Sequence, residues 1–159
     1  MADDAPGGNW RERLRSVLDA ASPAEIEAVL DRLWQAAPFA VVRPPRPALL
    51  LVAARDPFAT PFYLGELLVT EAEVALGDFT AGGAVCGDEP ERALLLAAAG
   101  AAEQAGAGKA IRVLEEFRRH LEPLRRRQQE ENEALVAATR VAFGSLRPER
   151  VDFGSLGGA

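Results

Sequence analysis

The chain has 159 residues, of which 48% are hydrophobic and 26% charged, and its formal net charge is −6. This length suffices for one domain with a buried core, and the negative charge argues against general binding of nucleic acid. The single cysteine, Cys86, excludes an intrachain disulfide, which fits a reducing cytoplasm. No apolar run approaches the roughly 20 residues that span a bilayer, and the N-terminus lacks a signal-peptide pattern, so we expect a cytoplasmic protein without a membrane partner.

The N-terminal part predicts a flexible tail followed by two helices. Residues 1–8 contain proline and glycine breakers. Asn9 predicts the cap of a first helix over residues 10–20. Ser22, Pro23 and Glu25 then supply a cap, a proline at the first helical position and a glutamate three residues after the cap. The second helix is therefore expected to begin there and to end before Pro38.

The middle of the chain predicts strands. Residues 39–43 are a short strand candidate, the prolines of residues 44–47 predict a stiff connector, and residues 48–55 form an apolar strand. A loop with two prolines follows at residues 56–61. Residues 79–87 predict a glycine-rich strand, in which Gly82 and Gly83 indicate a bulge, a bend or close contact with another backbone.

The most informative segment lies between that loop and that glycine-rich strand. Residues 62–78, FYLGELLVTEAEVALGD, predict one long strand, or two joined by a bulge, before a turn at Gly77 and Asp78. One face would carry Phe62, Leu64, Leu68, Val74 and Leu76, and the other Tyr63, Leu67 and Val69. A half-exposed strand is polar on one face, whereas the first half of this one is apolar on both. Both faces therefore need cover, which in a small chain can come from another subunit.

Glu66 is an exception within that segment, because it shares the predicted face of Phe62, Leu64 and Leu68. A glutamate on an apolar strand face is unfavourable unless it is paired. We therefore expect either a basic partner residue, from elsewhere in the fold or from another subunit, or an edge position open to water.

The C-terminal part predicts two further helices. Asp88 is the expected cap of an alanine-rich helix over about residues 89–104. Residues 109 to about 141 predict a long helical region that Pro123 kinks or splits. The tail then repeats itself, with RVAFGSL at residues 140–146 and RVDFGSL at residues 150–156. Such a segment suits docking in a groove as an extended chain, and folding back onto its own domain is the alternative.

The reactive side chains are few for a self-contained enzyme. The only histidine, His120, follows two arginines and predicts a surface or capping role. One cysteine and one histidine cannot form the usual four-ligand zinc site, so no metal is expected, and Cys86 is interpreted as a buried structural thiol. The rival hypothesis is a free-standing enzyme or small-ligand-binding protein that uses the region from Gly82 to Asp88, where a helix N-terminus could bind an anion.

In this order, the elements resemble the PhnG family, the G subunit of the carbon–phosphorus lyase core complex of bacterial phosphonate catabolism. The segments that carry the resemblance are WRERLRSVLDAASPAEIEAVLDRL, PALLLVAAR and FYLGELLVTEAEVAL, the last similar to a family pattern F-x-LGE-x-x-VTEA-x-V. A glycine-rich strand, an alanine-rich helix and a terminal Arg-Val-x-Phe motif complete it. The chain departs from the family pattern in the short sequence CGDEP, in the neutral residue near Ala97 and in the duplicated terminal motif.

The resemblance implies a non-catalytic accessory subunit that acts in assembly with H-, I- and J-type subunits, the I-type most directly. The complex would transfer a phosphonate to the ribose of ATP with release of adenine, giving α-D-ribose 1-phosphonate 5-triphosphate, and the J-type radical iron–sulfur enzyme would later cleave the C–P bond. ATP and the phosphonate would be substrates of the complex, and no cofactor is expected on this chain alone.

The sequence thus predicts an α+β fold with an N-terminal helical pair, a small, mostly antiparallel sheet over about residues 39–87, and C-terminal helices. We expect one domain over residues 9–146 and a docking tail at residues 147–159. No catalytic residue is expected. The predicted partner contacts are Phe62, Leu64, Gly65, Glu66, Thr70, Glu71, Arg140, Phe143, Arg150 and Phe153.

Overall fold

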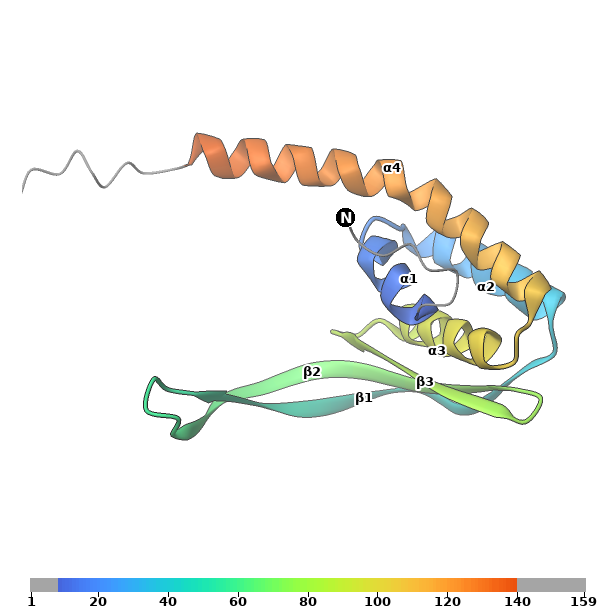
Figure 1. Cartoon of the computed structure of the whole chain (residues 1–159), viewed down its shortest axis with the longest axis horizontal. Helices are drawn as coiled ribbons and strands as arrows, with labels where there is room; N and C mark the ends of the chain where they lie inside the picture. Colours follow the sequence, from blue (N-terminus) through green and yellow to red (C-terminus); the bar gives the residue numbers. More distant parts are fainter. Residues whose placement is uncertain (1–8, 140–159) are drawn as a thin grey trace, which may run out of the picture.

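The computed structural model describes residues 9–139 and confirms the α+β class. Its elements are α1 (Trp10–Leu18), α2 (Pro23–Ala36), β1 (Phe39–Arg55), β2 (Pro61–Leu76), β3 (Phe79–Cys86), α3 (Pro90–Gln104) and α4 (Gly108–Ala138). The strands form one antiparallel sheet in the order β1-β2-β3. The helices all lie on one side of this sheet, with α3 next to it and α1, α2 and α4 beyond α3 (Figure 1).

The first two helices begin where their capping residues predict. The Asn9 side chain accepts a hydrogen bond from the Glu12 backbone N–H at the start of α1. At the start of α2, Ser22 and Glu25 form the reciprocal capping box. Residue His120 of α4 lies on the surface, as predicted, and its Nε2 is 2.7 Å from Glu25 Oε1. This hydrogen bond links the N-terminus of α2 to α4.

The predicted stiff connector at residues 44–47 is wrong, because β1 runs through these prolines without a break. β1 is an edge strand, where a residue without an N–H group does not remove a hydrogen bond from a central ladder. Register shifts between Val41 and Arg43, and again between Arg43 and Arg46, accommodate the prolines. Tertiary pairing with β2 therefore joins two predicted strands into one.

The long strand predicted after residue 61 is confirmed as β2, and so is the turn at Gly77 and Asp78. β3 pairs with β2 only from Val69 to Leu76, whereas β1 pairs with β2 as far as Pro61. Residues 48–55 of β1 and 61–68 of β2 therefore form a two-stranded extension, which we call the distal ribbon. Figure 1 shows the distal ribbon projecting beyond the helices.

Of the three arrangements expected for Gly82 and Gly83, the structure shows close contact with another backbone. A Cβ atom on Gly83 would lie 2.2 Å from the Ala93 carbonyl oxygen and 2.6 Å from the Ala97 nitrogen, both in the backbone of α3. Gly83 therefore marks close contact with another backbone. The same approach explains the small residues of α3, whose buried positions include an uninterrupted run from Leu95 to Ala102.

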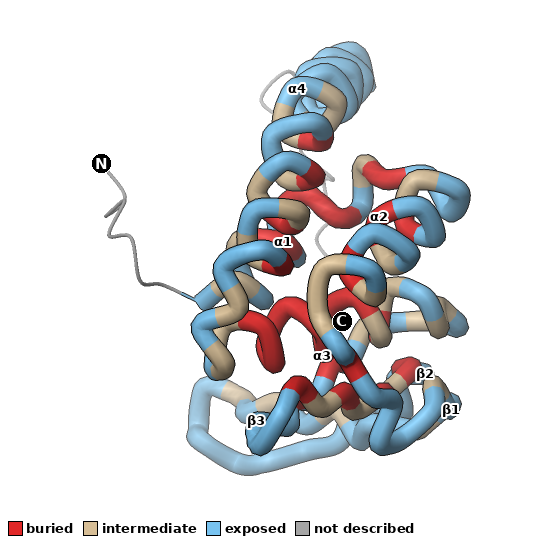
Figure 2. The backbone as a smooth tube through the Cα atoms, turned by 90° about the vertical axis from the view of Figure 1, so that its right-hand side faces the viewer, coloured by how far each residue is buried: buried red, intermediate tan, exposed pale blue. Residues whose placement is uncertain are grey.

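The core surrounds α3, between the sheet on one side and the other helices on the other, as Figure 2 shows by its buried positions. Its largest fully buried side chains include Leu14, Ile26, Leu33, Leu95, Leu96, Leu114 and Leu121. Pro123 lies inside a continuous α4 and does not split it, and Figure 1 shows this helix curving away from the body. Within residues 9–139, no helix combines the length and the apolar character that a membrane crossing needs.

A methyl group at Gly83 is predicted to destabilise the fold. We expect Gly83→Ala to lower the free energy of unfolding by about 1–3 kcal/mol or more, because the added Cβ would push β3 away from the backbone of α3. Urea denaturation followed by circular dichroism measures this difference. Gly82→Ala is the matched control, because its Cβ would meet only the Ala72 carbonyl oxygen at 3.9 Å. Equal losses in the two variants would contradict the backbone contact.

The capping box of α2 gives a prediction for acid stability. The Ser22 hydroxyl and the Ser22 backbone N–H donate to the Glu25 carboxylate at 2.6 and 2.8 Å, and together with His120 they lower the pKa of Glu25 from 4.5 to about 2. Because the folded chain holds the ionised form, this carboxylate stabilises the fold above pH 4.5, and the stabilisation is lost as the pH falls to about 2.

We therefore expect Glu25→Gln to lower the free energy of unfolding near pH 6 and to differ progressively less from the wild type as the pH falls from 4.5 to about 2. Urea titrations at several pH values measure the difference. Glu27→Gln, also on α2, controls for the loss of one negative charge. A Glu25→Gln difference that stays constant from pH 6 to about 2 would show that the carboxylate does not act in this way.

Candidate functional site

The distal ribbon exposes more apolar side chains than a free surface normally does. Its large apolar side chains on both strands have relative exposures between 41 and 72%. They are Leu49, Leu50, Leu51, Phe62, Tyr63, Leu64, Leu67 and Leu68. Exposed apolar side chains concentrated in one segment of a folded protein mark an interaction site. The structure thus leaves uncovered the part of β2 for which the sequence predicts cover on both faces.

The strand register divides these side chains between two faces of the distal ribbon. The face that continues the helix-covered side of the sheet, here called the helix-side face, carries Leu49, Leu51, Ala53, Tyr63, Glu66 and Leu68. The opposite, outer face carries Leu50, Val52, Ala54, Phe62, Gly65 and Leu67. Both faces are apolar, apart from Glu66.

A bulge corrects one detail of the predicted faces. Val52 pairs with Gly65 and Ala53 pairs with Tyr63, so Leu64 is the extra residue on β2. Gly65 has a φ of +144°, a conformation that favours glycine. Because of this extra residue, Phe62 lies on the face opposite Leu68 and Glu66, and the predicted common face for these residues is wrong.

The distal ribbon also has open hydrogen-bonding edges. β3 ends opposite Val69, and the Gly87 N–H still donates to the Leu68 carbonyl at 2.9 Å. Beyond that point, no further strand of the described chain pairs with β2 on this side, and none pairs with the outer edge of β1. Open edges of this kind accept an additional strand from another segment or chain.

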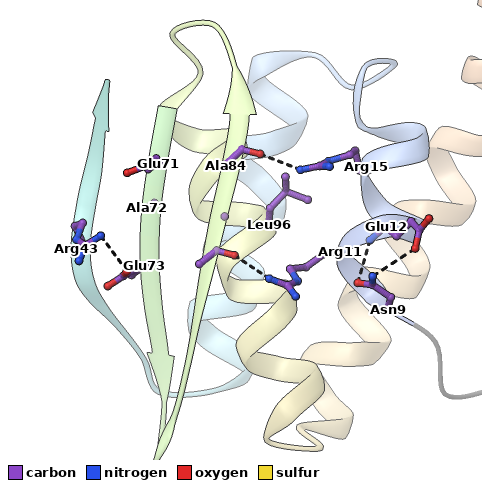
Figure 3. A pocket seen from close by; sticks show the side chains of 12 residues that line it. Asn9, Arg11, Glu12, Arg15, Arg43, Glu71, Ala72, Glu73, Ala84 and Leu96 are labelled. Atoms are coloured by element: carbon purple, nitrogen blue, oxygen red, sulfur yellow. Dashed lines mark hydrogen bonds and ion pairs between the residues drawn. The ribbon is translucent and has the colours of Figure 1, made fainter. Parts of the chain in front are cut away.

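The edge of β3, in contrast, is occupied by α1. Arg11 donates from Nη1 to the Gly82 carbonyl at 3.3 Å, and Arg15 donates from Nη2 to the Ala84 carbonyl at 3.1 Å (Figure 3). These two carbonyls face away from β2 and therefore lie on the outer edge of the sheet. α1 thus protects the outer edge of β3, whereas the outer edge of β1 and both edges of the distal ribbon have no such cover among the described residues.

Glu66 lies in the distal ribbon with its side chain exposed to solvent. Within residues 9–139, no ion pair to this carboxylate is found. The position is at an edge and open to water, which is one of the two expected arrangements. A basic residue from another subunit stays a prediction.

Thr70 has a role inside the fold and does not belong to the exposed surface. Its side chain is 1% exposed, and its hydroxyl donates to the Gly87 carbonyl at 2.7 Å and accepts from the Glu89 N–H at 3.0 Å. The predicted cap Asp88 is therefore wrong. Glu89 occupies the N-cap position of α3 without a side-chain cap, and Thr70 satisfies its backbone N–H.

The two neighbouring glutamates of β2 form ion pairs across the sheet. Glu71 pairs with Arg46 at 3.5 Å, and Glu73 pairs with Arg43 at 3.0 Å. Glu71, a predicted partner contact, is half-buried at the base of the distal ribbon. The other predicted contacts, Arg140, Phe143, Arg150 and Phe153, lie outside the described residues.

The rival site, from Gly82 to Asp88, borders a cavity of about 600 Å³ between α1 and the sheet (Figure 3). Its charged lining contains three arginines and three glutamates: Arg11, Arg15, Arg43, Glu12, Glu71 and Glu73. These charges balance, and the three arginines bind backbone carbonyls or Glu73, so the cavity offers no excess charge to a ligand.

The side chains with metal-binding or nucleophilic chemistry are scattered. Cys86 is exposed, so its interpretation as a buried thiol is wrong. Among residues 9–139, no group of three or more His, Cys, Asp or Glu side chains is placed to hold a metal ion. Sequence analysis also overlooked the contribution of Leu49, Leu50 and Leu51 to the candidate surface, although their unbroken apolar run was the available signal.

Comparison with known proteins identifies the family. The family model described as phosphonate metabolism protein PhnG matches residues 9–147, which is most of the 159-residue chain. The chain therefore belongs to the PhnG family, as its sequence resemblance indicates. The comparison with curated proteins gives no match.

The hydroxyl of Thr70 is predicted to stabilise the junction of β3 and α3. We expect Thr70→Val to lower the free energy of unfolding by about 1–3 kcal/mol, because the Glu89 N–H and the Gly87 carbonyl lose their partner in a buried place. Thermal and urea unfolding measure the change. Thr70→Ser keeps the hydroxyl and is the control. If Thr70→Val is as stable as the wild type, the hydroxyl has no structural role.

Proposed function

We propose that this chain is a non-catalytic accessory subunit of a carbon–phosphorus lyase complex. In this proposal, the complex transfers a phosphonate to the ribose of ATP and releases adenine, which gives α-D-ribose 1-phosphonate 5-triphosphate. Membership of the PhnG family supports a role in phosphonate metabolism. The observation that supports the accessory role is the distal ribbon, apolar on both faces and open at both edges.

The exposed area of the distal ribbon is large enough to matter energetically. Its leucine and aromatic side chains are roughly half exposed, so burying each of them in an interface contributes on the order of 1 kcal/mol. Association costs about 4–15 kcal/mol in lost freedom of motion, an amount that only several such side chains together can offset. The eight large apolar residues of the distal ribbon are divided between its two faces, so a partner must cover both faces to bury all of them.

The partner in this proposal is the I-type subunit, which carries the transferase chemistry, with H- and J-type subunits in the same cytoplasmic complex. The partner would add a strand to an open edge of the distal ribbon and cover its apolar side chains, including Phe62 and Leu64. A basic residue of the partner would pair with Glu66. ATP and the phosphonate are then substrates of the complex, and this chain holds no cofactor alone.

A charge in the distal ribbon is predicted to weaken the complex. Leu64 is 65% exposed and has no partner on β1, so Leu64→Asp changes the surface without breaking a strand pair. We expect the dissociation constant for the I-type subunit to rise by a factor of about 30 or more, as for a loss of 2 kcal/mol at a hot spot. Co-purification with a tagged I-type subunit and calorimetric titration measure the effect.

Val42 offers a matched control on β1, because it lies outside the distal ribbon. It is 55% exposed and, like Leu64, lies at a register shift where it pairs with no residue of the neighbouring strand. Val42→Asp is expected to bind as the wild type does. A Leu64→Asp variant that folds and still binds the I-type subunit with unchanged affinity would refute the assignment of the interface. Turnover of a nucleotide or a phosphonate by the isolated chain would refute the non-catalytic role.

A further inference from the structure

The last helix carries the chain towards the same side of the molecule as the distal ribbon. Figure 1 shows the C-terminal part of α4 and the distal ribbon projecting beyond the helical body in the same direction. α4 lies on the side of the sheet that the helices cover, and the helix-side face of the distal ribbon looks to that side. Residues 140–159 continue from this end of the helix.

The length of these residues is sufficient to reach the distal ribbon. In its first half, where its buried residues lie, α4 packs beyond α3, so two packing layers of 8–10 Å, about 20 Å in total, separate it from the strands, and its second half curves further away. The second repeat begins at Arg150, eleven residues after Thr139, and eleven extended residues span about 36 Å. The repeat at residues 150–156 can therefore reach the helix-side face even though α4 curves away.

The two surfaces are also chemically complementary. The helix-side face places the Glu66 carboxylate among Leu49, Leu51, Tyr63 and Leu68, and no basic side chain of residues 9–139 pairs with it. Each repeat has a valine and a phenylalanine two positions apart, which share one side of an extended chain, directly after an arginine. The apolar pair fits the leucines, and the long arginine side chain can reach the carboxylate.

We infer that, in the free chain, residues 140–159 fold back and cover the helix-side face of the distal ribbon, with the arginine of a repeat paired to Glu66. This contact shields an apolar surface that would otherwise promote aggregation. A partner that uses the same face then displaces the tail. The inference concerns the free chain alone and holds whether or not the distal ribbon binds an I-type subunit.

Thiol reactivity of two neighbouring positions tests the inference in the full-length protein. Cys86→Ser first removes the single, exposed cysteine. Leu51→Cys then places a thiol on the helix-side face and Leu50→Cys places one on the outer face, at wild-type exposures of 56 and 51%. The alkylation rate of each thiol by a small maleimide is compared between the full-length chain and a chain that ends at Thr139.

We expect truncation to raise the alkylation rate of Leu51→Cys about tenfold, which corresponds to a docking free energy of about 1.4 kcal/mol, and to leave Leu50→Cys unchanged. In the full-length chain, the protection is expected to be independent of protein concentration. Equal behaviour of the two thiols, or no effect of truncation, would overturn the inference. Protection that rises with concentration would show that a second copy covers the face and would overturn it too.

Charge reversal tests the role of Glu66 in the same assay. Glu66→Arg is expected to raise the alkylation rate of Leu51→Cys in the full-length chain about twofold to fivefold, as for the loss of one exposed ion pair. Combining it with Arg140→Glu and Arg150→Glu is expected to restore protection, and a failure to restore it would refute the pairing. Circular dichroism checks that each variant folds. Leu68→Cys and Leu67→Cys give a second pair of thiols, one on the helix-side face and one on the outer face.

Discussion

The structure depends on a mismatch in strand length. β2 has 16 residues and β1 has 17, but β3 has only eight. β3 ends where Gly87, with a φ of +88°, turns the chain towards α3, and the Thr70 hydroxyl holds this turn between the Gly87 carbonyl and the Glu89 N–H. Since α3 packs on β2 and β3, the helices cover only the part of the sheet that β3 reaches. The same short strand therefore fixes the end of the core and the start of the distal ribbon.

Within the covered half, packing is close because the facing surfaces carry small side chains. Gly83 lets β3 approach the backbone of α3, and Gly100 of α3 leaves room for the Ala81 side chain and for the stem of Arg11. Arg11 then extends to the Gly82 carbonyl, so the same close approach that packs α3 on the sheet also ties α1 to the sheet edge. Small residues thus bring α1, α3 and β3 into mutual contact.

Local chemistry predicts some of these elements and long-range contacts decide the others. The capping box of Ser22 and Glu25 and the turn at Gly77 act within four residues, so the sequence alone reveals them. The passage of β1 through its prolines depends on pairing with β2, and the start of α3 depends on a hydroxyl 19 residues away from Glu89. Neither signal is visible near the affected residues.

The candidate surface, too, depends partly on local sequence and partly on long-range contacts. An excess of apolar residues on both faces of β2 is a property of the sequence, and within residues 9–139 the first half of this strand is indeed left exposed. The distribution of these residues between faces depends on the bulge at Leu64, which only the register with β1 defines. Sequence reasoning therefore finds the segment, but it assigns Phe62 to the wrong side and includes Thr70, whose burial depends on the turn after β3.

The distal ribbon differs from a disordered docking peptide because its conformation exists before any contact. Its backbone is fixed by the pairing of β1 with β2, from the pair Leu49–Leu68 to the pair Arg55–Pro61. The ribbon also continues a sheet on which α3 packs. Binding a preformed strand pair avoids the ordering entropy of a flexible segment, about 1–2 kcal/mol per residue for the backbone. The same arrangement leaves several leucines of the described chain exposed to water, which is unfavourable and favours association through this part of the sheet.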